Sequence, residues 1–116
     1  MSASQFPAFS AIAFQLAAAL ETYEADVAVL VAAPFDVGVY QRVSGKMDEM
    51  RMYSAALPSL AVAWVDVMIR HFELTHGMWK KQNGDSAAAD LVQLHRQLSE
   101  AVLRLSSKCV GMRPAT

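Results

Sequence analysis

The sequence predicts an all-α protein that folds as an antiparallel up-down-up-down four-helix bundle in one domain, residues 1–116, and that dimerises. Apolar residues recur three or four positions apart along most of the chain, which is the spacing of helices. Prolines and glycines divide this pattern into four segments with short connections, and short connections favour antiparallel neighbours. Hydrophobic residues make up 54% of the chain, which favours burial of some apolar surface against a second subunit.

The first helix is predicted over residues 8–33. Pro34 disfavours helical geometry in the residue before it, so the helix should end near Ala33. Asp36 can then cap the next helix with its side chain. The residues expected to face the core alternate four and three apart, as in helices packed almost parallel to their neighbours. They are Phe9, Ala13, Leu16, Leu20, Tyr23, Val27 and Leu30.

The second helix is predicted over residues 36–57, with a glycine in its middle. A glycine inside a helix costs about 1 kcal/mol against alanine, so Gly45 is either simply tolerated or allows a neighbouring helix to approach closely. The residues expected to face inward are Tyr40, Val43, Met47, Met50 and Leu57.

The third and fourth helices are predicted over residues 59–82 and 86–109. Pro58 should end the second helix and Ser59 should cap the third, which Asn83-Gly84 should then stop. Cys109 falls on the apolar side of the fourth helix, where a buried structural thiol is expected. The inward stripe of the fourth helix is Leu91, Leu94, Leu98, Ala101, Val102 and Leu105.

The third helix carries more apolar surface than one core needs. Its apolar arc covers roughly 200°, against a little over 100° for an ordinary surface helix. We interpret the arc as two surfaces, one for the core and one for a partner, although neighbouring helices that splay apart would cover it as well. The first stripe is Leu60, Trp64, Val67, Leu74 and Met78, and the second is Ala61, Val65, Met68, Phe72 and Trp79. The interface candidates are Trp64, Val67, His71, Leu74, Met78 and Trp79.

Four polar or small positions fall at one level of the predicted bundle. Counting 1.5 Å per residue from each turn places Tyr23, Gly45, His71 and His95 in a middle layer. Three interpretations remain open, because buried imidazole and hydroxyl groups need hydrogen-bond partners in each of them. The histidines lie at an edge and meet water, or the layer is structural, or it lines a ligand pocket.

No motif of known catalytic chemistry occurs in the chain, and we expect no catalytic residue, metal or cofactor. Glu73 and His76 form one Glu-x-x-His, the element that di-iron bundles use twice. They are weak metal candidates, because Glu73 falls on the polar side of its helix and no second such element is present.

The charges argue against nucleic acid and membranes as partners. The net charge is −1, and no clustered basic face is evident. The first helix is purely acidic, because the first cation of the chain is Arg42, so the partners of this helix should supply cations. No apolar run reaches the roughly 18 residues that span a bilayer. The run AFSAIAFQLAAAL lacks the basic flank of a secretory signal and is interpreted as mature helix, and a single cysteine fits the cytoplasm.

These features favour a small non-enzymatic interaction module, acting as a homodimer or as an adaptor or chaperone for a helical partner through the wide apolar face of the third helix. The alternative is a ligand- or metal-binding bundle, possibly an enzyme, that uses the Tyr/His layer. A third possibility, a peripheral protein that coats a hydrophobic surface, is opposed by the acidic first helix, because anionic membranes attract basic helices.

Overall fold

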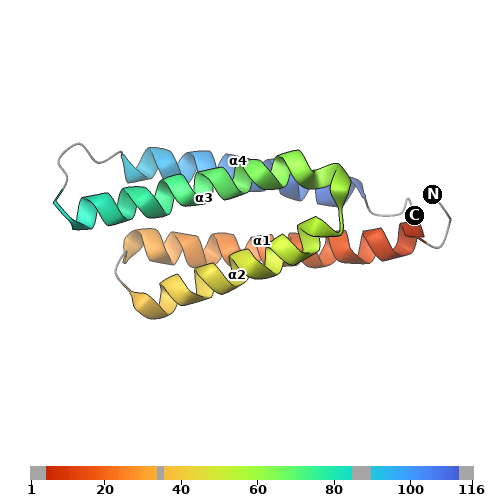
Figure 1. The fold of residues 1–116 in the computed structure, drawn as a ribbon, viewed down its shortest axis with the longest axis horizontal. Coiled ribbons are helices and arrows are strands. Elements are labelled where there is room, and N and C mark those ends of the chain that lie inside the picture. The colour runs from red at the N-terminus through yellow and green to blue at the C-terminus, as the bar shows by residue number, and fades with distance from the viewer. Residues whose placement is uncertain (1–4, 34–35, 85–89, 113–116) are drawn as a thin grey trace.

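Four α-helices pack together in the computed structural model, which describes residues 5–33, 36–84 and 90–112 (Figure 1). The helices are α1 (Gln5–Ala32), α2 (Val37–Ala55), α3 (Ala61–Gln82) and α4 (Leu91–Gly111). A short 3-10 helix, η1 (Pro58–Leu60), connects α2 to α3. The fold is therefore all-α, as the apolar periodicity predicted. Within these ranges no helix is both long and apolar enough to cross a membrane.

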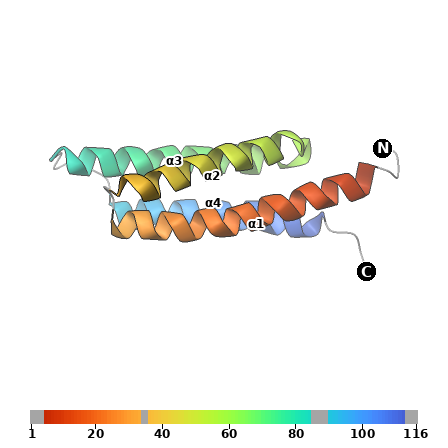
Figure 2. The same ribbon diagram turned by 90° about the horizontal axis from the view of Figure 1, so that it is seen from below.

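The four helices do not contact one another equally. α1 packs extensively against both α2 and α4, and α3 packs extensively against α4. α2 and α3 meet closely at the η1 end and diverge toward their other ends (Figure 1). Seen from the second direction, α1 and α4 form one side of the bundle, and α2 and α3 form the other (Figure 2). The α2/α3 side is thus the loosely packed side.

The predicted inward stripes of α1 and α4 are found in the core, with Phe9 and Leu94 half-buried at its margin. The expectation for α2 was wrong at Tyr40, which is 48% exposed, because α2 and α3 diverge at that end. Val39 is buried there instead. The buried side of α2 and the following turn is Val39, Val43, Met47, Met50, Ser54 and Leu57.

The helix ends follow the predicted signals in most places. Asp36 Oδ1 accepts a hydrogen bond from the Val39 amide at 3.1 Å, which confirms the predicted cap of α2. Gly84 has a φ of +76° just after α3, which confirms the predicted stop. Ser59 does not cap α3, because it lies inside η1 and no side chain caps either helix start there.

The predicted start of the fourth helix, residue 86, lies among residues 85–89, outside the part of the chain that the structure describes. The observed helix begins at Leu91, and Asp90 Oδ1 accepts a hydrogen bond from the Val92 amide at 2.9 Å. Asp90 is thus a second carboxylate cap that the sequence analysis did not identify.

Two mid-helix glycines have different surroundings. A Cβ atom added to Gly45 would meet nothing within 4 Å, so this glycine is tolerated and does not mark a close approach. A Cβ atom on Gly77 would lie 2.8 Å from Leu94 Cδ1 and 3.3 Å from Leu91 Cδ2. The close approach that we considered for Gly45 therefore occurs at Gly77, between α3 and α4.

Candidate functional site

One side of α3 presents a continuous apolar stripe to the outside of the bundle. Its members alternate three and four positions apart, the spacing with which one helix packs along another. The exposed fraction of its apolar side chains runs from 44% at Val65 to 86% at Val62. We call this surface the outer stripe of α3. It consists of Val62, Val65, Ile69, Phe72, His76 and Trp79.

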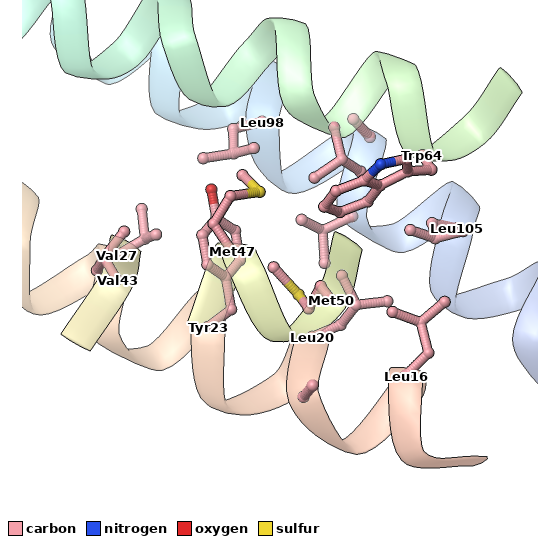
Figure 3. Packing of buried hydrophobic residues seen from close by; sticks show 14 of the residues in the cluster. Leu16, Leu20, Tyr23, Val27, Val43, Met47, Met50, Trp64, Leu98 and Leu105 are labelled. Carbon is pink, nitrogen blue, oxygen red and sulfur yellow. The ribbon is translucent and has the colours of Figure 1, made fainter. Parts of the chain in front are cut away.

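The first stripe of the predicted arc, by contrast, belongs to the core. Trp64, Val67, His71, Leu74 and Met78 are all buried inside the single chain, so of the six interface candidates Trp79 is the one at the surface, 60% exposed. Figure 3 shows the Trp64 indole turned inward among core residues of the other helices. The structure divides the apolar arc into a buried stripe and an exposed stripe, and the sequence did not reveal which stripe faces which way.

Val62 and Ile69 were missing from the predicted stripes although both lie on the outer stripe. The signal that could have found them is the unbroken three-four alternation from Val62 to Trp79, which passes through His76 and was hidden by that polar residue. His76 is compatible with an apolar stripe, because its ring stacks on the Trp79 ring with centroids 6.0 Å apart and planes 13° apart.

A band of charged side chains borders the outer stripe on the α4 side. Asp66 Oδ2 accepts a hydrogen bond from Arg104 Nη2 of α4 at 2.6 Å, and Asp66 Oδ1 lies 3.5 Å from Arg70 Nε. Arg70 Nη1 also lies 3.5 Å from Glu73 Oε1 and donates to Gln97 Oε1 at 3.3 Å. The band carries both signs of charge and joins α3 to α4.

A buried polar pair crosses the core between α1 and α3. Tyr23 Oη and His71 Nδ1 are 2.8 Å apart, and both side chains are buried. Figure 3 shows the Tyr23 hydroxyl pointing away from α1, beside Met47. Burial lowers the pKa of His71 to about 4, so the ring is neutral near pH 7 and its Nδ1 can accept a hydrogen bond from the Tyr23 hydroxyl. Burial, and to a smaller extent the charge of Glu24, raise the pKa of Tyr23.

The structure brings together two of the four predicted ligand-pocket residues. Among the described residues no hydrogen bond or ring contact joins His95 or Gly45 to the Tyr23–His71 pair, and Gly45 is exposed. None of these four residues lines the hollow between α1 and α4 or the hollow beside Tyr40 and Trp79. The geometry therefore supports a structural polar pair, with each partner satisfying the other.

The weak metal candidates are engaged elsewhere. Glu73 pairs with Arg70, and His76 stacks on Trp79. Within the described ranges no group of three or more His, Cys, Asp or Glu side chains is placed to hold a metal ion. Cys109 is buried as predicted, and burial raises the pKa of its thiol to about 11. The thiol is therefore protonated near neutral pH and a poor nucleophile.

Comparisons of the chain with protein-family models, with curated proteins and with solved structures found no match. The function is therefore argued from the surfaces of the molecule alone.

Proposed function

We propose that this chain is a small non-enzymatic protein-interaction module that forms a homodimer through the outer stripe of α3. The observation that carries the proposal is the exposure of six consecutive three-four positions on one helix, five of them apolar. A soluble monomer rarely leaves a contiguous apolar patch on its surface without a use for it. The proposal takes the helices to run up-down-up-down, a course that the short α1–α2 and α2–α3 connections favour.

A second copy suits this stripe because its borders do not repel themselves. In a two-fold symmetric dimer the same patch serves both partners, so each charge near the stripe faces charges from an identical set. Asp66 and Glu73 on the border are accompanied by Arg70 and Lys80, and the stripe itself carries no carboxylate or ammonium group. Two copies can therefore approach without a net like-charge penalty.

Large aromatic side chains supply the contact area that such an interface needs. Phe72 is 61% exposed and Trp79 is 60% exposed, and aromatic residues of this kind dominate the centres of protein interfaces. Trp79 remains the interface candidate of the sequence analysis, and Phe72 now stands beside it. We place the module in the cytoplasm, on the support of its single reduced cysteine.

The proposal is tested by measuring the oligomeric state of the full chain over about 1–100 µM by sedimentation velocity and native mass spectrometry. The native chain should be a dimer. Ile69→Glu places a charge in the middle of the stripe and should give a monomer with unchanged helical circular dichroism. The matched control is Met52→Glu on α2, where Met52 is 72% exposed but outside the stripe, and this variant should remain a dimer.

A native chain that is monomeric across this range would contradict the homodimer. A dimer that Ile69→Glu leaves intact would contradict the use of α3. A bound metal or small molecule in the native mass spectrum would instead favour the alternative function, a ligand-binding bundle.

A further inference from the structure

A second surface lies on the side of the bundle formed by α1 and α4, whereas the outer stripe belongs to α3 (Figure 2). A hollow of about 650 Å³ lies between α1 and α4. We call it the α1/α4 groove. It is lined from α1 by Phe14, Ala17, Ala18, Leu20, Glu21 and Glu24 and from α4 by side chains that include Leu103 and Val110. Leu103 is 67% exposed and Val110 is 52% exposed, so apolar side chains are open to solvent here as well.

The α4 wall of the groove has the spacing that receives a helix. Five of the seven α4 residues that line the groove lie three, four, three and four residues apart, the spacing of a second packing seam besides the one that faces the core. These positions are Arg96, Ser99, Leu103, Ser106 and Val110. At 1.5 Å per residue they extend over about 21 Å, which is about four helical turns. The length favours a helix as occupant over a compact small molecule.

Small side chains on both walls allow a helix to approach closely. The α1 wall includes Ala17 and Ala18, and the α4 wall includes Ser99 and Ser106. Beside such small residues, the apolar side chains of a third helix can enter between the two walls. The groove therefore provides holes, and its occupant must provide the large apolar side chains.

The charges of the groove determine the chemistry of that occupant. The lining holds the carboxylates of Glu21, Glu24 and Glu100 against the single guanidinium of Arg96. None of these carboxylates has an ion-pair partner in the part of the chain that the structure describes. A second copy docked symmetrically in this groove would bring two acidic sets together, which is unfavourable. This is the opposite of the mixed charges beside the outer stripe of α3.

We infer that the α1/α4 groove binds an amphipathic helix of a different protein, apolar along one stripe and bearing lysine or arginine on the borders of that stripe. The absence of any lysine or arginine from α1 agrees with this, because the helix that forms one wall cannot neutralise its own glutamates. The inference does not depend on the dimer, since the two surfaces use different helices. If both are right, the module joins a self-associating face to a face that recognises basic helices.

The test is a fluorescence anisotropy titration of the full chain into a labelled helical peptide of about 20 residues, built from leucine, alanine and lysine with leucine at three-four spacing. The comparison peptide carries glutamate in place of lysine. The lysine peptide should bind, and raising the salt concentration from about 50 to 500 mM should weaken its binding. The glutamate peptide should bind at least about tenfold more weakly.

Variants at exposed groove positions place the binding site. Glu100→Lys and Leu103→Glu should each weaken binding of the lysine peptide by about tenfold. The matched controls are Asp48→Lys and Met52→Glu, which make the same changes of side-chain charge at exposed positions of α2. They should alter binding less than about twofold. Ile69→Glu should remove the dimer and leave peptide binding unchanged, so the two proposals fail separately.

Three outcomes would overturn the inference. The first is no binding of the lysine peptide at about 100 µM protein and low salt. The second is equal binding of the two peptides, or equal effects of groove and control variants. The third is a native dimer that Leu103→Glu dissociates while Ile69→Glu does not, which would show that a second copy covers the groove.

Discussion

The Tyr23 hydroxyl and Nδ1 of His71 form a hydrogen bond of 2.8 Å, and this bond joins α1 to α3 across the bundle. α1 and α3 otherwise lie diagonally opposite each other, because α1 packs on α2 and α4. The pair therefore fixes the relative position of two helices that share little other contact. A buried polar pair of this kind can specify register in a core made mostly of aliphatic side chains.

Removing both partners of the pair should cost less than the sum of the costs of removing each alone. Tyr23→Phe leaves His71 Nδ1 buried without its hydrogen-bond partner and should lower the free energy of unfolding by about 1–3 kcal/mol. His71→Leu should have a comparable cost, and the double variant should be less unstable than the sum of the two. Urea unfolding of the four proteins gives the coupling, which we expect to be about 1 kcal/mol. Additive effects would show that the bond contributes nothing.

The neutral state of His71 makes the fold sensitive to acid. Its pKa falls from about 6.5 to about 4 on folding, so between these values the unfolded chain binds a proton that the folded chain does not. The contribution of neutral His71 to the free energy of unfolding should be fully present above pH 6.5. This contribution should decrease by about 3 kcal/mol as the pH drops toward 4. His71→Leu should lose this component between those pH values, while the acid sensitivity of the carboxylates remains. The free energy of unfolding in urea is measured against pH for the native chain and for His71→Leu. Parallel curves for the two proteins would contradict the assignment of this acid sensitivity to His71.

Alanine should have different effects at the two mid-helix glycines. Gly45→Ala enters open space on an exposed helix face and should raise the free energy of unfolding by about 1 kcal/mol. At Gly77 the new Cβ atom would displace Leu94, which should cancel that gain. Gly77→Val should go further and cost about 1–3 kcal/mol through overpacking. The stability of each variant is measured by thermal unfolding. An equal gain in stability at both glycines would contradict the close approach of α3 and α4 at Gly77.

Much of the fold was predictable because the apolar period specifies what each helix buries. The stripe from Ala13 to Leu30 and the caps at Asp36 and Gly84 depend on local sequence, and local sequence determined them correctly. Counting residues from the turns also placed Tyr23 and His71 at one level, where the structure joins them.

The features that the sequence did not predict depend on how the helices pack beside one another, and local sequence patterns do not specify this packing. Tyr40 was expected inside and lies outside because α2 and α3 diverge, and among the described residues no hydrogen bond or ring contact joins His95 to Tyr23. The direction of the two α3 stripes was equally hidden, since an arc of about 200° looks the same whichever half meets the core. The α1/α4 groove was unpredicted for the same reason: the residues of its two walls lie more than 70 positions apart in the sequence.

The packing of α1 on both α2 and α4 has a consequence for the growing polypeptide. α1 meets its first neighbour after one short turn, but its second neighbour is the last of the four helices to be synthesised. At a synthesis rate of about 5–20 residues per second, α4, the other wall of the groove, follows α1 and α2 only after several seconds. Until then the face of α1 that packs on α4 lacks its cover. The groove thus forms only after α4 has been synthesised, and a helix that bound it would distinguish chains that carry all four helices from chains that still lack α4.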